Sequence, residues 1–170
     1  MSYEAGRYRG KLYRALNPVY AREPLSGRGA ALYGGRFNPK GTSALYVATS
    51  LHTAIREANQ VGDLQPTTIV AYDADIDAVF DGRDPAELAR FGMTSEALAD
   101  PSWRDQMKGG GRAHTQAFAE TLMAQRYNGL LVRSFARGAT EQDINLVLWT
   151  WGEDLPARIM LIDDQGRLSS

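Results

Sequence analysis

Short segments rich in aliphatic, aromatic and β-branched residues recur along the chain, and they constrain the fold more than any other feature. Their patterning predicts β-strands at residues 11–16, 44–48, 67–73, 78–81, 129–134, 144–149 and 157–163. Helices are predicted at fewer places, namely residues 51–61, two short helices starting at Asp84 and Asp100, and residues 113–127. Because the helices do not alternate regularly with the strands, we expect an α+β fold rather than a doubly wound sheet.

Glycine and proline mark the segments between these elements. Residues 17–31 are predicted to form a loop, and residues 108–112, with the sequence KGGGR, a flexible loop. Thr49 or Ser50 is expected to cap the helix over 51–61, and Gly62 is expected to end it.

The size and composition of the chain exclude several classes of protein. With 170 residues and no internal repeat or long linker, the chain is expected to form one domain spanning residues 1–170. It contains no cysteine, which excludes a disulfide framework, a zinc–thiolate site and a cysteine nucleophile. No apolar run approaches the ~18 residues of a membrane span, and the first residues lack a signal-peptide core. We therefore expect a cytoplasmic protein without membrane attachment.

Charge is distributed unevenly along the chain. The first 60 residues carry nine Lys or Arg and three Asp or Glu, whereas residues 61–170 carry ten and seventeen. A near-neutral protein with one cationic third fits a cleft that focuses an anionic group better than a surface that coats nucleic acid. Sixteen of the nineteen basic residues are arginine, whose forked donors suit phosphate.

The glycine-rich segment GRGAALYGGRFN at residues 27–38 is the first candidate for binding. It contains neither a P-loop nor a dinucleotide-binding fingerprint. Its glycines, Gly35 among them, either bring the backbone close to a ligand or form a tight turn between elements. Arg36 within it is either a phosphate ligand or a solvated loop arginine.

Three later residues are further candidates, each with a plain structural alternative. Tyr46 lies in an apolar strand and is either a core residue or a ring that stacks on a planar ligand. Glu57 lies on a short, mostly apolar helix and is either solvated or able to stabilise positive charge on a ribose. Ser134 ends a predicted strand, but no histidine is placed to activate it as a nucleophile.

The sequence offers little support for a metal or a catalytic triad. His52 and His114 lie in predicted helices at a spacing that suits neither, and we read both as surface or partly buried residues. Asp73, Asp75 and Asp77 alternate as in a calcium loop, but the remaining ligands are missing. We therefore expect no metal.

Several motifs taken together resemble the RES domain, a family of toxins from bacterial toxin–antitoxin pairs. The resemblance rests on LYRAL at residues 12–16, on LSGRGAALYGGRFNPKGTSALYVATSLHTAIREA at 25–58, and on the later strand that ends in Ser134. Tyr46 follows Arg36 by ten residues, and Glu57 follows Tyr46 by eleven. The similarity is strong over the first two stretches and looser after them. Phe37 stands where the family often has tryptophan, which keeps an aromatic ring.

This resemblance implies an ADP-ribosyltransferase-like split β structure with flanking helices around a cleft for NAD, the co-substrate. By position, Arg36, Tyr46 and Glu57 would be catalytic, and the residues binding NAD would be Arg14, Gly35, Arg36, Tyr46 and Ser134. The arginines would hold the pyrophosphate, and Tyr46 would stack on nicotinamide. Glu57 would stabilise an oxocarbenium-like transition state, while Ser134 would bind the carboxamide or a ribose hydroxyl.

The resemblance also implies partners. It implies a cognate antitoxin that covers the cleft, and an acceptor for ADP-ribose that is a cytoplasmic protein, water or phosphate. Two alternatives remain open: a nucleic-acid-binding module, because basic and aromatic residues interleave over residues 3–14, and an RNase-type or other hydrolase toxin. If the chain is a RES domain toxin, nucleic acid is not expected as a partner except through the antitoxin.

Overall fold

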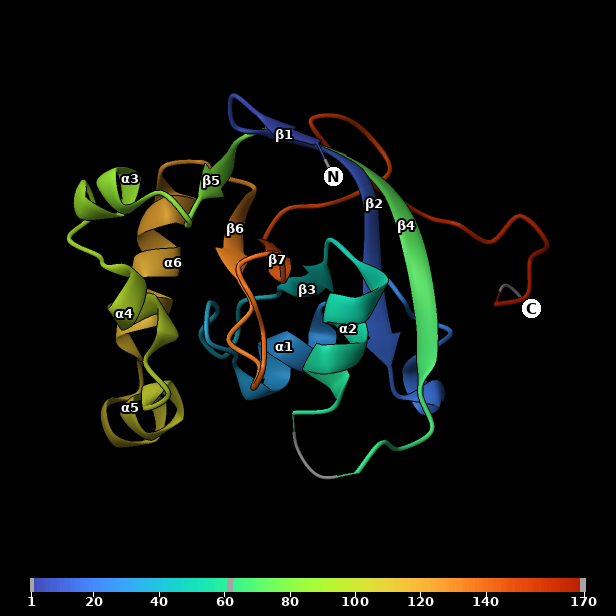
Figure 1. The fold of residues 1–170 in the computed structure, drawn as a ribbon, viewed down its shortest axis with the longest axis horizontal. Helices are drawn as coiled ribbons and strands as arrows, with labels where there is room; N and C mark the ends of the chain where they lie inside the picture. The colour runs from blue at the N-terminus through green and yellow to red at the C-terminus, as the bar shows by residue number, and fades with distance from the viewer. Residues whose placement is uncertain (1, 61–62, 169–170) are drawn as a thin grey trace.

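The computed structural model describes residues 2–60 and 63–168, and within them the chain forms one eight-stranded sheet with flanking helices (Figure 1). The strands are β1 (Ser2–Glu4), β2 (Arg7–Leu16), β3 (Leu45–Ala48), β4 (Thr68–Ile76), β5 (Val79–Asp81), β6 (Gly129–Arg133), β7 (Ile144–Leu148) and β8 (Ala157–Leu161). The helices are the 3₁₀ helix η1 (Pro18–Tyr20), α1 (Arg28–Tyr33), α2 (Leu51–Ala58), α3 (Pro85–Ala89), α4 (Ser95–Ala99), α5 (Trp103–Gly110) and α6 (His114–Ala124). The predicted α+β class is confirmed.

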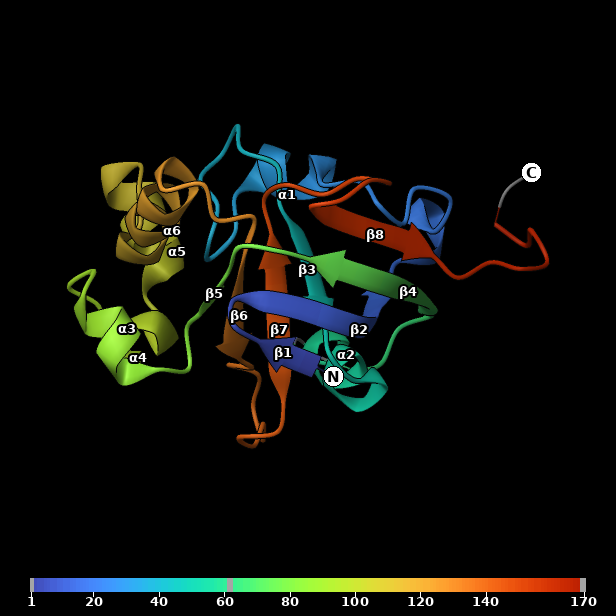
Figure 2. The ribbon, with the colours of Figure 1, turned by 90° about the horizontal axis from the view of Figure 1, so that it is seen from above.

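The sheet divides into two halves between β2 and β3. The strand order is β5-β6-β7-β3-β2-β4-β8, with β1 paired to β2. β2 and β4 pair continuously from Tyr8 to Leu16, whereas among the described residues β2 and β3 share the single registered pair Tyr13–Ala48. Figure 2 shows the strands of the two halves running across each other. A divided sheet of this kind is what the family resemblance implied.

β6 and β7 separate two apolar cores, one on each face of these strands. Leu131 and Leu146 belong to the core that both halves of the sheet share, whereas Leu130 and Val147 pack in a second core with the helices. Alternate side chains of a strand point to opposite faces. Both strands are therefore covered on both sides, which explains why they read as continuous apolar runs.

The helices that follow β5 gather beside β5 and β6 (Figure 1). Phe80 of β5 packs edge-to-face with Phe91 and Phe118, at ring-centroid distances of 5.2 and 5.9 Å. Such aromatic pairs fix the orientation of neighbouring elements beyond their burial of area. In contrast, α2 packs against β2 and β3, directly at the divide of the sheet.

Three predictions, of two loops and of one helix start, were wrong. Residues 17–31 contain η1 and the start of α1 and are not entirely loop. Neither helix buries a residue, so neither has the apolar periodicity in the sequence that would predict a helix. The KGGGR segment is not a separate loop, because α5 continues through Gly110 and ends at Gly111, whose φ of 79° suits a glycine C-cap.

The third wrong prediction concerns the helix expected to start at Asp100. This residue instead lies in the turn before α5, where its carboxylate accepts hydrogen bonds from the backbone N–H and the hydroxyl of Ser102. α4 precedes that turn and is capped by Thr94. The stop expected at Gly62 lies outside the described residues, and α2 ends at Ala58.

Candidate active site

Two adjoining cavities open where the sheet divides. Their volumes are about 250 and 470 Å³, which together fall in the range of a small-ligand site. Both are lined by four polar residues, namely Arg14, Tyr46, Glu57 and Asn145. The larger cavity is also lined by the glycine-rich loop (including Gly35 and Arg36), by Trp103 and Arg104 of α5, and by Phe135. The structure therefore brings Arg14, Gly35, Arg36, Tyr46 and Glu57 together at one site.

The glycine-rich loop is held in place by buried side chains. Asn38 is fully buried, and its Nδ2 donates to the carbonyls of Ala30 and Thr42 at 2.8 and 2.9 Å. Gln116 of α6 is also fully buried, and its Nε2 donates to the carbonyl of Gly35 at 2.9 Å. Because such buried bonds exclude water and specify one arrangement, the loop presents a preorganised wall to the cavity.

Tyr46 anchors this loop through its hydroxyl. The hydroxyl donates to Asn38 Oδ1 at 2.6 Å and accepts from the backbone N–H of Phe37 at 3.0 Å. Burial raises the pKa of the Tyr46 phenol well above its usual range. A Cβ on Gly35 would lie 2.5 Å from the Tyr46 hydroxyl, so glycine is required there for close approach. The Tyr46 ring, rather than its hydroxyl, remains available to a ligand.

Arg36 is partly committed to protein contacts. Its Nη1 donates to the carbonyls of Leu98 and Asp100 at 3.0 and 2.8 Å. Its guanidinium also lies 4.5 Å from the ring centroid of Phe135. Burial, and secondarily the neighbouring Arg104, lowers the pKa of Arg36 from its ordinary value. The other guanidinium donors of Arg36 are the ones that can serve an anion in the cavity.

Arg14 reaches the cavities from β2. Its Nη1 donates to the carbonyls of Pro24 and Ser26, at 3.2 and 3.3 Å. These bonds tie the segment after η1 to the strand and orient the guanidinium. Arg14 thus adds a second oriented cation to the walls that Arg36 also lines.

Glu57 is the carboxylate of the site, and donors surround it. Ser50 caps α2 by accepting from the backbone N–H of Thr53 at 3.1 Å, as one of the two expected caps. Seven residues later, Glu57 Oε1 accepts from Asn145 Nδ2 at 2.6 Å and from the Ser134 hydroxyl. Its Oε2 accepts from the Gln60 side chain. These bonds orient the carboxylate toward the two cavities that it lines.

Ser134 lies behind Glu57 rather than in the cavities. It is 9% exposed, its hydroxyl donates to Glu57 Oε1, and its own oxygen accepts from the backbone N–H of Ala136. It lines a separate hollow beside Gly82 and Arg83. The expected direct contact with a carboxamide or ribose hydroxyl is therefore not what this geometry offers, because the hydroxyl's hydrogen is used by Glu57. The position indicates that Ser134 orients the carboxylate.

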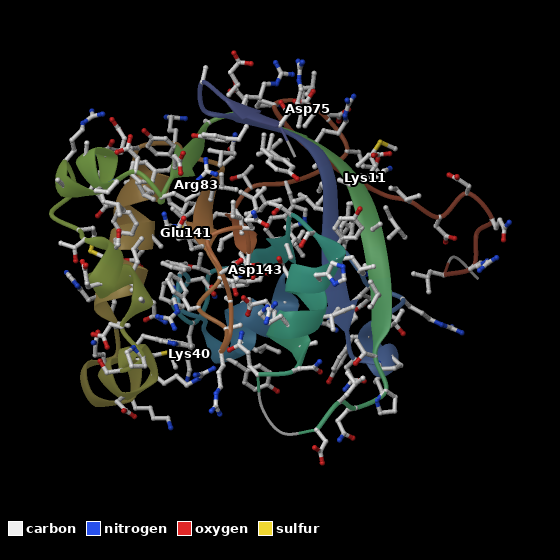
Figure 3. All side chains as sticks on the ribbon, in the orientation of Figure 1. Lys11, Lys40, Asp75, Arg83, Glu141 and Asp143 are labelled. Atoms are coloured by element: carbon white, nitrogen blue, oxygen red, sulfur yellow. The ribbon has the colours of Figure 1, made fainter. Side chains whose placement is uncertain are left out.

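Asp143 supports α2 from the connection between β6 and β7 (Figure 3). One carboxylate oxygen accepts from the Thr53 hydroxyl at 2.8 Å, and the other from the backbone N–H of Thr140 at 2.8 Å. The Thr140 N–H, then the Thr53 hydroxyl, lower the pKa of the Asp143 carboxyl. This network ties the helix that carries Glu57 to the strand that carries Asn145.

Comparison with known proteins identifies the family. A family model described as the RES domain matches residues 11–169. The chain belongs to the RES domain family. A stretch of 53 residues is also 47% identical to a protein named Toxin Res from Photorhabdus laumondii subsp. laumondii. That stretch covers 31% of this chain and 34% of the relative, so the match spans about a third of each.

In this RES domain, sequence reasoning missed Asn145, Gln60, Trp103, Arg104 and Phe135. A signal for Asn145 was present, because it is the polar residue within the apolar strand INLVLW. No signal marked Trp103 and Arg104, which lie on a short helix far from the glycine-rich loop in sequence. Their place beside Arg36 depends on how α5 packs.

Other residues weighed from the sequence lie away from the RES domain site. Tyr8 is fully buried in the core, and Arg7 pairs with Asp75 at 2.7 Å, so the N-terminal segment does not present a row of free rings and cations. His52 and His114 are exposed. Within residues 2–60 and 63–168, no group of three His, Asp or Glu side chains is arranged to hold a metal. No helix of those residues is long and apolar enough for a bilayer.

Proposed function

We propose that this RES domain is the toxin of a toxin–antitoxin pair that binds NAD, cleaves its nicotinamide–ribose bond and transfers ADP-ribose to a protein, water or phosphate. One observation carries the proposal: Glu57, Arg14 and the ring of Tyr46 line both cavities, and a second guanidinium group, that of Arg36, lines the larger one. The name of the Photorhabdus relative supports the toxin part. The family resemblance supports the NAD part.

The proposed reaction needs a negatively charged group near the ribose rather than a general acid. The bond between ribose C1′ and the pyridine nitrogen breaks, and its electron pair neutralises the cationic ring. Nicotinamide leaves as a neutral molecule, so it needs no proton. The acceptor oxygen or nitrogen then bonds to C1′ and loses its proton to solvent. Positive charge develops on the ribose, and Glu57, already oriented by three donors, stabilises that charge without reorganisation.

The pyrophosphate of NAD has a cationic wall available. The guanidinium of Arg104 lies 4.4 Å from the centroid of the Trp103 ring and has no hydrogen bond or ion pair within the part of the chain that the structure describes. It lies near Arg36, whose pKa it lowers. Two guanidinium groups held close together repel each other until an anion bridges them. We therefore assign Arg104 to the pyrophosphate, with Arg14 and the free donors of Arg36.

The ring of Tyr46 is assigned to the nicotinamide. Its hydroxyl is fixed to the loop, so the ring has one orientation and loses little freedom when a planar ligand stacks on it. An oriented ring and an oriented carboxylate together hold the scissile bond in one position.

Glu57→Gln tests the proposed function. The substitution keeps the size of the side chain but removes its charge, so we expect nicotinamide release from NAD to fall by about 10²–10³-fold. Release is measured by chromatography with purified protein. Glu120→Gln is the matched control, because Glu120 lies on α6 and pairs with Arg112 at 2.8 Å, away from both cavities. Equal release by Glu57→Gln and the unaltered protein would contradict the proposal.

The partner proposed for this toxin is an antitoxin that covers the cavities. The wall formed by Arg14, Arg36 and Arg104 fits acidic residues on such a partner. The antitoxin should therefore suppress nicotinamide release and protect Arg104 from chemical modification. Release that continues in a saturated complex would exclude coverage of the site.

A further inference from the structure

In the side-chain amide of Asn145, the nitrogen is hydrogen-bonded, whereas the oxygen has no partner among the described residues. Its Nδ2 donates to Glu57 Oε1 at 2.6 Å. An ionised carboxylate can only accept, so the amide nitrogen must face Glu57 and the orientation of the amide is fixed. Within residues 2–60 and 63–168, the other end, Oδ1, is buried and has no hydrogen-bond partner.

This orphaned oxygen is unusual for its surroundings. Buried carbonyl oxygens in folded proteins are nearly always hydrogen-bonded, because leaving one unpaired costs free energy. The described residues hold one other buried, unpaired side-chain atom, Arg56 Nε, which has the carboxylate of Asp143 3.5 Å away. Asn145 Oδ1 has no hydrogen-bond partner among the described residues, although its side chain lines both cavities. A hydrogen-bond donor on a bound ligand would offset the free energy lost by leaving this oxygen unpaired.

The position of Asn145 on β7 relates it to the ring of Tyr46. Tyr46 on β3 pairs with Val147, and Ala48 pairs with Asn145, so Asn145 lies one step along the same face of the paired strands. A pyridine ring that stacks on Tyr46 with its substituent directed along β3 toward Ala48 places that substituent beside Asn145. The substituent of nicotinamide is a carboxamide, whose N–H groups are neutral donors.

We propose that Asn145 Oδ1 accepts a hydrogen bond from the carboxamide of nicotinamide and makes the site select NAD over the dinucleotide that carries a carboxylate there. The inference rests on the proposed NAD chemistry. The carboxylate analogue, nicotinic acid adenine dinucleotide, offers no N–H to Asn145 and places a second negative charge close to Glu57. Asn145 is thus a specificity residue as well as a donor to Glu57.

Substrate preference separates these two roles of Asn145. The preference is the ratio of kcat/KM for NAD to kcat/KM for the carboxylate analogue, measured by release of the pyridine product. We expect the unaltered protein to prefer NAD by about 10²-fold and Asn145→Ala to lower that preference by at least about tenfold. Ser134→Ala is the matched control, because it also removes one donor from Glu57 Oε1 but does not line the cavities.

The control should lose rate on both dinucleotides and keep its preference within about threefold of the unaltered protein. Asn145→Ser, a smaller change, repeats the test, and circular dichroism confirms that each variant folds. If Asn145→Ala and Asn145→Ser keep the preference while losing rate, Asn145 acts through Glu57 alone and the inference fails. Cleavage of both dinucleotides at equal rates by the unaltered protein overturns the inference alone, whereas cleavage of neither overturns the proposed function as well.

Discussion

The hydroxyl of Tyr46 should stabilise the fold independently of any substrate, and Tyr46→Phe removes it while keeping the ring. Two groups lose their partner in this variant, namely Asn38 Oδ1 and the backbone N–H of Phe37. Asn38 is fully buried, so water does not replace the lost bond. At about 1–3 kcal/mol for each buried group left unpaired, and with partial relaxation of the loop, the free energy of unfolding should fall by about 2–4 kcal/mol.

Urea denaturation followed by circular dichroism measures this loss directly. For a chain of this length, the same change should lower Tm by about 5–15 °C. Tyr33→Phe is the matched control, because the Tyr33 side chain is 75% exposed and lies outside the core. A loss below about 0.5 kcal/mol for Tyr46→Phe, as expected for a surface substitution, would refute the view that Tyr46 anchors the glycine-rich loop.

Two further predictions concern charge. Arg104→Gln should raise KM for NAD about tenfold with little change in kcat, because a cation that holds the pyrophosphate in ground and transition states alike contributes uniform binding. The control is Arg90→Gln, at the C-cap of α3, and KM values equal to that of the unaltered protein would remove Arg104 from the site. Asp143→Asn should destabilise the protein most above the ordinary Asp pKa of about 4. The pKa of Asp143 is lower in the folded than in the unfolded protein, so the ionised carboxylate stabilises the fold above that pH, and this stabilisation disappears as pH falls through the pKa of the folded protein. Unfolding free energies of both proteins across the acidic range test this, and a constant difference at every pH would contradict it.

Much of the candidate site was predictable because its residues lie close together in the sequence. Arg36, Tyr46 and Glu57 fall within 22 consecutive residues, and a loop, a strand and a helix follow one another there. A short strand followed directly by a capped helix leaves few ways to place these side chains. Local patterning therefore predicted the elements, and the family resemblance predicted which of their residues share a site.

The role of Ser134 could not be predicted in the same way. It lies 77 residues after Glu57, and whether its hydroxyl faces a cavity or the carboxylate depends on how β6 and the following loop meet α2. The positions of Trp103 and Arg104 could not be predicted either. Trp103 is the buried residue of α5, and nothing in the sequence of this helix indicates that it packs beside the glycine-rich loop. Long-range packing decided all three positions.

The amino-acid sequence by itself determined the α+β class, most strands, the helix α2 with two candidate caps, and the family, because these depend on apolar periodicity, capping residues and local motifs. Only the tertiary structure decided that the sheet divides at the single Tyr13–Ala48 pair, that the cavities open there, and that Asn145 and Arg104 line them. The physical reason is that strand pairing and helix docking join residues far apart in the chain. The free energy of those contacts depends on the whole packed arrangement, which no local pattern encodes.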